Sequence, residues 1–213
     1  LTLFHFACPN WLAARGGWLC PEAPELFADF ARRIVDLCGG KVRYWITVNE
    51  PEVYAFMAYV MGEFPPRRRL RFDLCFRAMK NLHLGHALAY DAIHTANPCA
   101  QAGIAKHFKR FMPLRWWQPL DRAGAWAAKR LFDEWGLTGF LEHRGKKVSD
   151  FVGVNYYGRM RMCGLSGLSP LAGFPPCILE QWGADCDDMW EQDPEHLRDC
   201  LAEAARRTRL PLY

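Results

Sequence analysis

The feature that most constrains the fold is a regular alternation of strand-like and helix-like segments. Short apolar runs predict strands at 1–6, 41–48, 101–108 and 149–157. Apolar residues at helical spacing predict helices at 24–38, 72–97, 121–137 and 194–208. No hairpin signal interrupts the pattern. Such alternation predicts an α/β fold, in which a parallel sheet is joined by helical crossovers.

Local signals sharpen this pattern. In the helix at 24–38, Leu26, Phe30, Ile34 and Leu37 share one apolar face, and the helix ends at a pair of glycines. The Gly/Pro/Ser-rich stretch 164–176 predicts a loop. We expect a further strand to begin at 210–213, with the sequence LPLY.

Two α/β architectures fit, an open doubly wound sheet and a (β/α)8 TIM barrel. An open nucleotide-binding sheet usually carries a glycine-rich phosphate loop, and the glycine pairs at 16–17 and 39–40 do not form one. The sequence therefore favours the barrel. A whole barrel typically takes about 250 residues, and this chain has 213 residues, of which 51% are hydrophobic. We expect a single domain over 1–213, without a second domain, that holds about half of a barrel.

Polar side chains cluster where the predicted strands end. The clearest case is WITVNEP at 45–51, in which a β-branched run breaks into Asn49 and Glu50 before a proline. His5, Asn155 and Tyr157 also stand at the ends of strands. The carboxyl ends of barrel strands carry the catalytic residues of this fold. Glu50 is therefore a candidate catalytic carboxylate, with helix capping or a salt bridge as the structural alternative.

Composition and charge limit the classes of partner that the protein is expected to bind. The net charge is +4, and the one basic run, PPRRRLR at 65–71, predicts a solvated loop rather than a nucleic-acid site. The nine cysteines lack C-x-x-C spacing, so we expect free thiols in a reducing, cytoplasmic compartment and neither a metal nor another cofactor. His83 and His86 lack the adjacent glutamate of a metalloprotease helix and are expected to be structural. No apolar run is long enough for a membrane span, so no membrane partner is expected.

The nine tryptophans allow two interpretations. They can fill the core, or they can serve as stacking platforms for flat or sugar-like ligands.

Six segments, in order along the whole chain, resemble the motifs of glycoside hydrolase family 1, the retaining β-glucosidases and β-galactosidases. They are LTLFHFACPNWL, KVRYWITVNEP, AYVMGEFPP, NLHLGHALA, DFVGVNYYGR and the C-terminal DDMWEQDPEHLRDCLAEAARRTRLPLY. The resemblance runs from the family's third strand to the start of its seventh. Phe6 and Ala7 depart from the pattern, since the family usually has Trp and Asp there.

The resemblance implies a role for each candidate residue. Glu50 would be the general acid/base of a retaining double displacement. Asn49 would hydrogen-bond the 2-hydroxyl of the sugar, and His5 would bind another hydroxyl of the same sugar. Asn155 would line the site near the scissile bond, and Tyr157 would orient the nucleophile.

Trp190 would be a stacking platform for the leaving group. The implied substrate is a small β-glycoside or oligosaccharide, with no cofactor. In the family the nucleophile belongs to a T-E-N-G motif on the seventh strand, and no Asp or Glu of these 213 residues matches that position. We therefore expect the nucleophile to lie outside the chain as given.

Three situations fit a chain without the nucleophile: a piece of a longer enzyme, a chain completed by a second chain, or a shortened protein that only binds. The first function hypothesis is a β-glucosidase-like hydrolase. The second is an inactive barrel remnant that binds glycans or a partner. Another N-E-P barrel glycosidase, such as an endo-acting cellulase, is disfavoured by the segments NYYGR and DDMWEQDPEHLRD.

Overall fold

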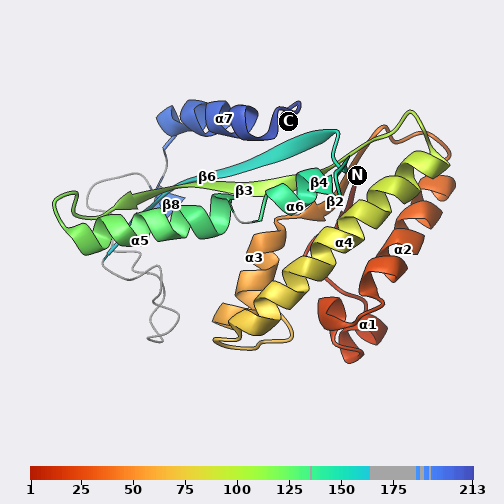
Figure 1. Cartoon of the computed structure of the whole chain (residues 1–213), viewed down its shortest axis with the longest axis horizontal. Coiled ribbons are helices and arrows are strands. Elements are labelled where there is room, and N and C mark those ends of the chain that lie inside the picture. The colour runs from red at the N-terminus through yellow and green to blue at the C-terminus, as the bar shows by residue number, and fades with distance from the viewer. Residues whose placement is uncertain (135, 164–185, 188–189, 192) are drawn as a thin grey trace. The chain divides into compact units, whose positions relative to one another are not determined.

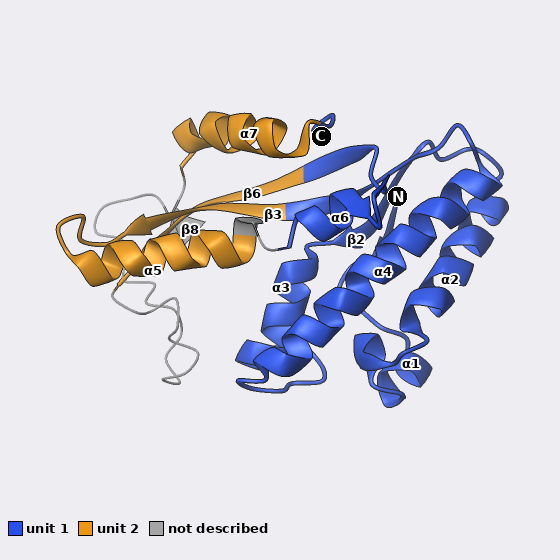
Figure 2. Cartoon of the chain, in the orientation of Figure 1, with its two compact units in different colours: residues 1–106, 136–153, 210–213 blue, residues 107–135, 154–209 orange. Residues whose placement is uncertain are grey.

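The computed structural model describes residues 1–134, 136–163, 186–187, 190–191 and 193–213 (Figure 1), with only the backbone at 133–134, 186–187 and 190–191. The chain divides into two compact units (Figure 2). Unit 1 comprises residues 1–106, 136–153 and 210–213, and unit 2 comprises residues 107–135 and 154–209.

Parallel strands form the sheet of unit 1. Strand β1 (Thr2–Phe4) pairs with β2 (Tyr44–Asn49), and β2 pairs with the first half of β3 (Gln101–Pro113). A parallel bridge joins Val152, in β6 (Phe151–Met162), to Leu212. The predicted start of a strand at 210–213 is thus confirmed, because this segment lies beside β6.

In unit 1, helices follow β1 and β2, and a short helix precedes β6. They are α1 (Asn10–Ala14), η1 (Gly17–Leu19), α2 (Ala23–Cys38), α3 (Pro51–Phe56), η2 (Met57–Met61), α4 (Phe72–Ala96) and α6 (Thr138–Leu141). The long helices α2 and α4 lie side by side (Figure 1). Both were predicted within one or two residues of their ends, and Gly39 ends α2 in the left-handed conformation.

The predicted inward face of α2 is only partly right. Leu26 and Ile34 pack against the core, but Phe30 and Leu37 are exposed. The buried row is Phe27, Ala31 and Val35. Trp18 explains the shift, because its ring contacts Phe27 edge to face at 5.3 Å between centroids. Helix α4 comes so close to the same indole that a Cβ on Gly85 would clash with it.

Unit 2 contains the second halves of β3 and β6, helix α5 (Pro119–Lys129), the π-turn η3 (Arg130–Glu134) and helix α7 (Glu195–Thr208). Two short strands, β7 (Cys186–Asp187) and β8 (Trp190–Glu191), complete it. The six-stranded sheet runs in the order β1-β2-β3-β6-β8-β7.

The parallel strands were predicted from the sequence, but the lack of a hairpin signal was misleading, because antiparallel pairs occur as well. Strand β8 pairs antiparallel with both β6 and β7. A second antiparallel pair joins β4 (Glu142–His143) to β5 (Lys146–Lys147). Its two-residue turn, Arg144-Gly145, has positive φ at both positions, as a tight hairpin requires. An Arg-Gly pair is a weaker hairpin signal than Asn-Gly, so the sequence did not reveal it.

The core of unit 1 is large and aromatic. Trp18, Trp45, Met79, Leu82 and Ile93 are among its fully buried side chains. The basic segment 65–71 is exposed, which confirms the predicted solvated loop. Within the residues that the structure describes, no helix is both long and apolar enough to cross a membrane.

Candidate active site

The first strand ends of unit 1 bring His5 and Asn49 to one edge of the sheet. Phe4 and Val48 are register partners in the parallel pair β1–β2. His5 and Asn49 each come directly after these partners, and therefore lie next to each other in register. His5 is exposed and Asn49 is buried. The clustering of polar residues at strand ends, predicted from the sequence, is present in this unit.

Glu50 forms the turn between β2 and α3. Its φ of +43° lies in the left-handed region, which is uncommon for a residue with a side chain. Two backbone hydrogen bonds fix it: its N–H donates to the Ala105 carbonyl at 2.7 Å, and its carbonyl accepts from the Tyr54 N–H at 3.1 Å. The side chain makes no capping bond to α3. The helix-capping alternative is therefore excluded, and the acid/base role of Glu50 stays a prediction.

A buried ion pair lies in the first turn of α3. Lys106 Nζ contacts Glu52 Oε1 at 2.6 Å, and the two side chains are 0% and 3% exposed. Glu52 follows Glu50 by two residues, and Lys106 follows Ala105, the residue that accepts the Glu50 N–H bond. The pair thus ties the first turn of α3 to β3 directly behind Glu50. Neither residue was predicted from the sequence. The one sequence feature that indicated this pair is the second glutamate of NEPE at 49–52.

A pocket of about 490 Å³ opens beside His5. Phe6, Cys8, Tyr54 and Phe64 are among its lining residues, so most of its wall is apolar. Burial raises the pKa of the Cys8 thiol, and burial also raises the pKa of the Tyr54 hydroxyl well above its usual range. Both groups therefore stay protonated at neutral pH.

The two conspicuous histidines of α4 are structural, as predicted. His86 is fully buried and hydrogen-bonds Thr47 Oγ1 at 2.6 Å and the Phe140 carbonyl at 3.1 Å. His83 contacts the Gly136 carbonyl at 3.2 Å. Burial lowers the pKa of both imidazoles, that of His86 to about 4.

The remaining candidates lie in unit 2. Asn155 and Tyr157 lie within β6, which continues to Met162, and not at the end of a strand as the sequence predicted. Asn155 is half-buried, and the exposed ring of Tyr157 stacks on His107 at 4.9 Å between centroids. Trp190 is in β8, but its side chain lies outside the described residues. Their predicted roles toward the sugar and the nucleophile stay predictions.

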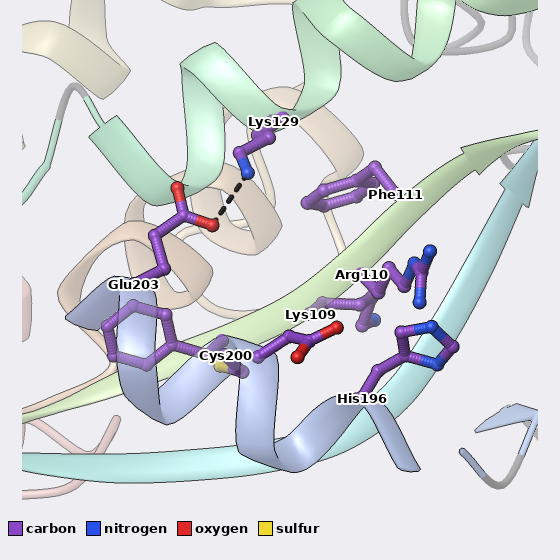
Figure 3. A pocket seen from close by; sticks show the side chains of 9 residues that line it. Lys109, Arg110, Phe111, Lys129, His196, Cys200 and Glu203 are labelled. Atoms are coloured by element: carbon purple, nitrogen blue, oxygen red, sulfur yellow. Dashed lines mark hydrogen bonds and ion pairs between the residues drawn. The ribbon is translucent and has the colours of Figure 1, made fainter. Parts of the chain in front are cut away.

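A second pocket, of about 240 Å³, lies in unit 2 between β3 and α7 (Figure 3). Lys129 crosses one side of it to form an ion pair with Glu203 at 2.7 Å. Lys109, Arg110 and His196 point into the other side (Figure 3). His196 is bonded to Asp193, and Glu203 is shared between Lys129 and Arg207.

Comparison with known proteins identifies the class. The family model of glycosyl hydrolase family 1 matches residues 1–142. The chain is 30% identical to the galactolipid galactosyltransferase SFR2 of Arabidopsis thaliana over 175 residues, which cover 77% of this chain and 27% of that protein. It is 32% identical to β-glucosidase A of Thermotoga maritima over 113 residues, which cover 53% of this chain and 25% of that protein.

Solved structures agree. A β-glycosidase from Pyrococcus horikoshii, 27% identical, superposes with a TM-score of 0.75 over 100% of this chain and 51% of that chain. A family 1 glycoside hydrolase from Thermotoga maritima, complexed with a cyclophellitol analogue, shares the fold with a TM-score of 0.83 at 24% identity over 100% of this chain and 52% of that chain.

The chain belongs to glycosyl hydrolase family 1. Its parallel sheet and helices match part of the family's (β/α)8 barrel, as the sequence predicted. The chain spans about a quarter of the length of these two curated relatives and about half of these solved chains.

Proposed function

We propose that this protein acts on terminal β-linked sugars as a retaining β-glycosidase, with Glu50 as its general acid/base. The observation that carries the proposal is the position of Glu50: a buried carboxylate on a constrained strand-to-helix turn, at the sheet edge that also holds His5 and Asn49. Membership of glycosyl hydrolase family 1 supports it.

The proposed reaction has two steps. In the first, the Glu50 carboxylic acid gives its proton to the glycosidic oxygen as the bond from that oxygen to the anomeric carbon breaks and a second carboxylate bonds to that carbon. In the second, the Glu50 carboxylate takes a proton from water as the water oxygen attacks the anomeric carbon and the second carboxylate leaves. The second carboxylate must stand about 5–5.5 Å from Glu50. That it comes from outside these 213 residues, for instance from a second chain, stays a prediction.

The backbone around Glu50 suits this role. General acid/base catalysis needs a carboxyl held in place while the substrate moves against it. The bonds from Glu50 to Ala105 and Tyr54, together with the Glu52–Lys106 pair, fix the turn on two sides. His5 and Asn49 can then hydrogen-bond sugar hydroxyls from the adjacent strand ends.

Transfer to another alcohol is the second candidate function. A relative that matches 77% of this chain is named as a galactolipid galactosyltransferase. Transfer shares the first step of hydrolysis and differs only in the acceptor, which is a sugar hydroxyl in place of water. The two activities are distinguished by the products, free sugar or a longer glycoside.

The test is turnover of 4-nitrophenyl β-glucoside and β-galactoside by these 213 residues together with the segment or second chain that supplies the second carboxylate, with chromatography of the sugar products. Glu50→Gln should lower kcat/KM by about 10²–10⁴-fold, the range of general acid/base catalysis. Glu63→Gln, an exposed glutamate after η2, is the matched control and should leave the rate unchanged. Folded wild-type protein that holds the second carboxylate and binds glycosides without turnover would contradict the proposal and favour the binding alternative.

A further inference from the structure

The buried ion pair of Glu52 and Lys106 joins helix α3 to strand β3 beside the Glu50 turn. Both side chains are buried, and Lys106 Nζ contacts Glu52 Oε1 at 2.6 Å. The other oxygen, Glu52 Oε2, is buried without a hydrogen-bond partner among the described residues. Apolar side chains of similar volume often stabilise a protein as well as a buried ion pair does, or better. Stability alone therefore does not account for charged groups at these two positions.

The residues next to the pair form the Glu50 turn. Glu50 precedes Glu52 by two positions, and its N–H donates to the carbonyl of Ala105, the residue before Lys106. Asn49, which ends β2, is the register partner of the same Ala105. Successive side chains of a strand point to opposite faces, so Lys106 contacts α3 from the face opposite to Ala105. The ion pair and the Glu50–Ala105 bond thus join the same two segments, 50–52 and 105–106.

The backbone of Glu50 needs such a constraint. Its φ of +43° is unfavourable for a residue with a Cβ, and a conformation of this kind persists only where the surrounding structure over-determines it. The two backbone bonds, to Ala105 and from Tyr54, each fix one side of the turn. The ion pair adds a directional contact that sets the position of α3 against β3. Apolar packing would let these two elements shift, because it has no preferred direction.

We propose that Glu52 and Lys106 are positioning residues for Glu50. Their ion pair holds the turn in the conformation from which the Glu50 carboxyl reaches the glycosidic oxygen. This inference rests on the proposed function, in which Glu50 is the general acid/base. The pair acts through the position of Glu50 and does not itself touch the substrate. Misplacing a reacting group by about 1 Å can lower a rate by about 10²-fold.

The test is the double variant K106M/E52L, studied with the segment or second chain that supplies the second carboxylate. Its kcat/KM on an alkyl β-glucoside, which needs a proton to depart, should fall by about 10²-fold. The loss on 2,4-dinitrophenyl β-glucoside should be far smaller, because this leaving group departs without protonation. Hydrogen exchange at the Glu50 and Tyr54 amides should become at least about tenfold faster, while urea unfolding stays close to that of the wild type.

Two further variants sharpen the test. Glu52→Gln keeps the side-chain shape and one acceptor oxygen, so it should show the same selectivity for the alkyl glycoside with a smaller loss. The matched control H94Q/D150N alters a contact of 3.0 Å between His94 Nε2 and Asp150 Oδ2, near the start of β3. It should keep the wild-type ratio of the two rates and wild-type exchange at the Glu50 amide.

The outcomes separate this inference from the proposed function. Wild-type rates in the folded K106M/E52L variant, or equal losses on both glycosides, would overturn the positioning role while leaving Glu50 as the acid/base. Unchanged amide exchange at Glu50 would overturn it as well. Equal losses from Glu50→Gln on both glycosides would overturn the proposed function, and this inference with it.

Discussion

Helix α4 comes after strand β2 and helix α5 comes after strand β3, yet the two helices place their apolar residues in opposite ways. Helix α4 in unit 1 buries Met79, Leu82 and Ile93 in a large core. Helix α5 in unit 2 buries glycine and alanine and exposes Trp126. The difference shows that the number of apolar residues in a helix does not by itself tell how much that helix contributes to stability. In unit 1 the apolar residues build the core, whereas in unit 2 part of them lie on the surface.

The strongest test of this comparison is to replace one tryptophan in each unit with alanine. Trp45 is fully buried, and its indole N–H donates to the Val42 carbonyl at 3.1 Å. Trp45→Ala should lower the free energy of unfolding by about 3–5 kcal/mol, through lost burial and a cavity. Trp126→Ala should change it by no more than about 0.5 kcal/mol. Urea unfolding followed by circular dichroism measures both, and similar losses would refute the contrast.

The buried ion pair provides the next test. Lys106→Met leaves the Glu52 carboxylate buried without its cation, which should cost about 3–5 kcal/mol of unfolding free energy. The double variant K106M/E52L removes both charges and should recover most of that loss. Urea unfolding of the single and double variants checks this. A double variant as unstable as the sum of its single variants would mean that the two groups do not interact.

A smaller change in the free energy of unfolding is expected when the pH is lowered. The pKa of His86 is lowered from 6.5 to about 4 by burial, so the unfolded chain binds this proton at a higher pH than the native protein. Stability from this group is present above pH 6.5 and is lost as pH falls toward 4. Because a pKa change of one corresponds to about 1.4 kcal/mol, the loss should be about 3 kcal/mol.

Urea unfolding of the wild type and His86→Gln between pH 7 and 4 measures this loss. The stability advantage of the wild type over the variant should shrink by about 3 kcal/mol as the pH falls. A difference that stays constant with pH would show that His86 does not titrate in this window.

Much of the fold and part of the site could be predicted from the sequence. Helices α2 and α4 and the turn at Glu50 carry strong local signals, namely apolar periodicity, terminal glycines and the break at Pro51. The inward row of α2 depends on the packing of Trp18 against Phe27, a contact that the apolar periodicity of the helix does not indicate. The Glu52–Lys106 pair joins residues 54 positions apart, and no periodicity indicates such a contact.

The two interpretations of the tryptophans were likewise left open by composition. Trp18 and Trp45 fill the core of unit 1, whereas Trp116, Trp117 and Trp126 face solvent. Only a structure distinguishes the buried tryptophans from the exposed ones. Helix α5 packs through the small residues on its other face, and so leaves Trp126 in solvent.

The most direct test of the central claim compares leaving groups. We would measure kcat/KM for an alkyl β-glucoside, which needs protonation to depart, and for a 2,4-dinitrophenyl β-glucoside, which does not. If Glu50 is the general acid, Glu50→Gln should lower the rate on the alkyl glycoside by about 10²–10⁴-fold and have a far smaller effect on the first step with the dinitrophenyl glycoside. Equal losses on both substrates would contradict the assignment of Glu50.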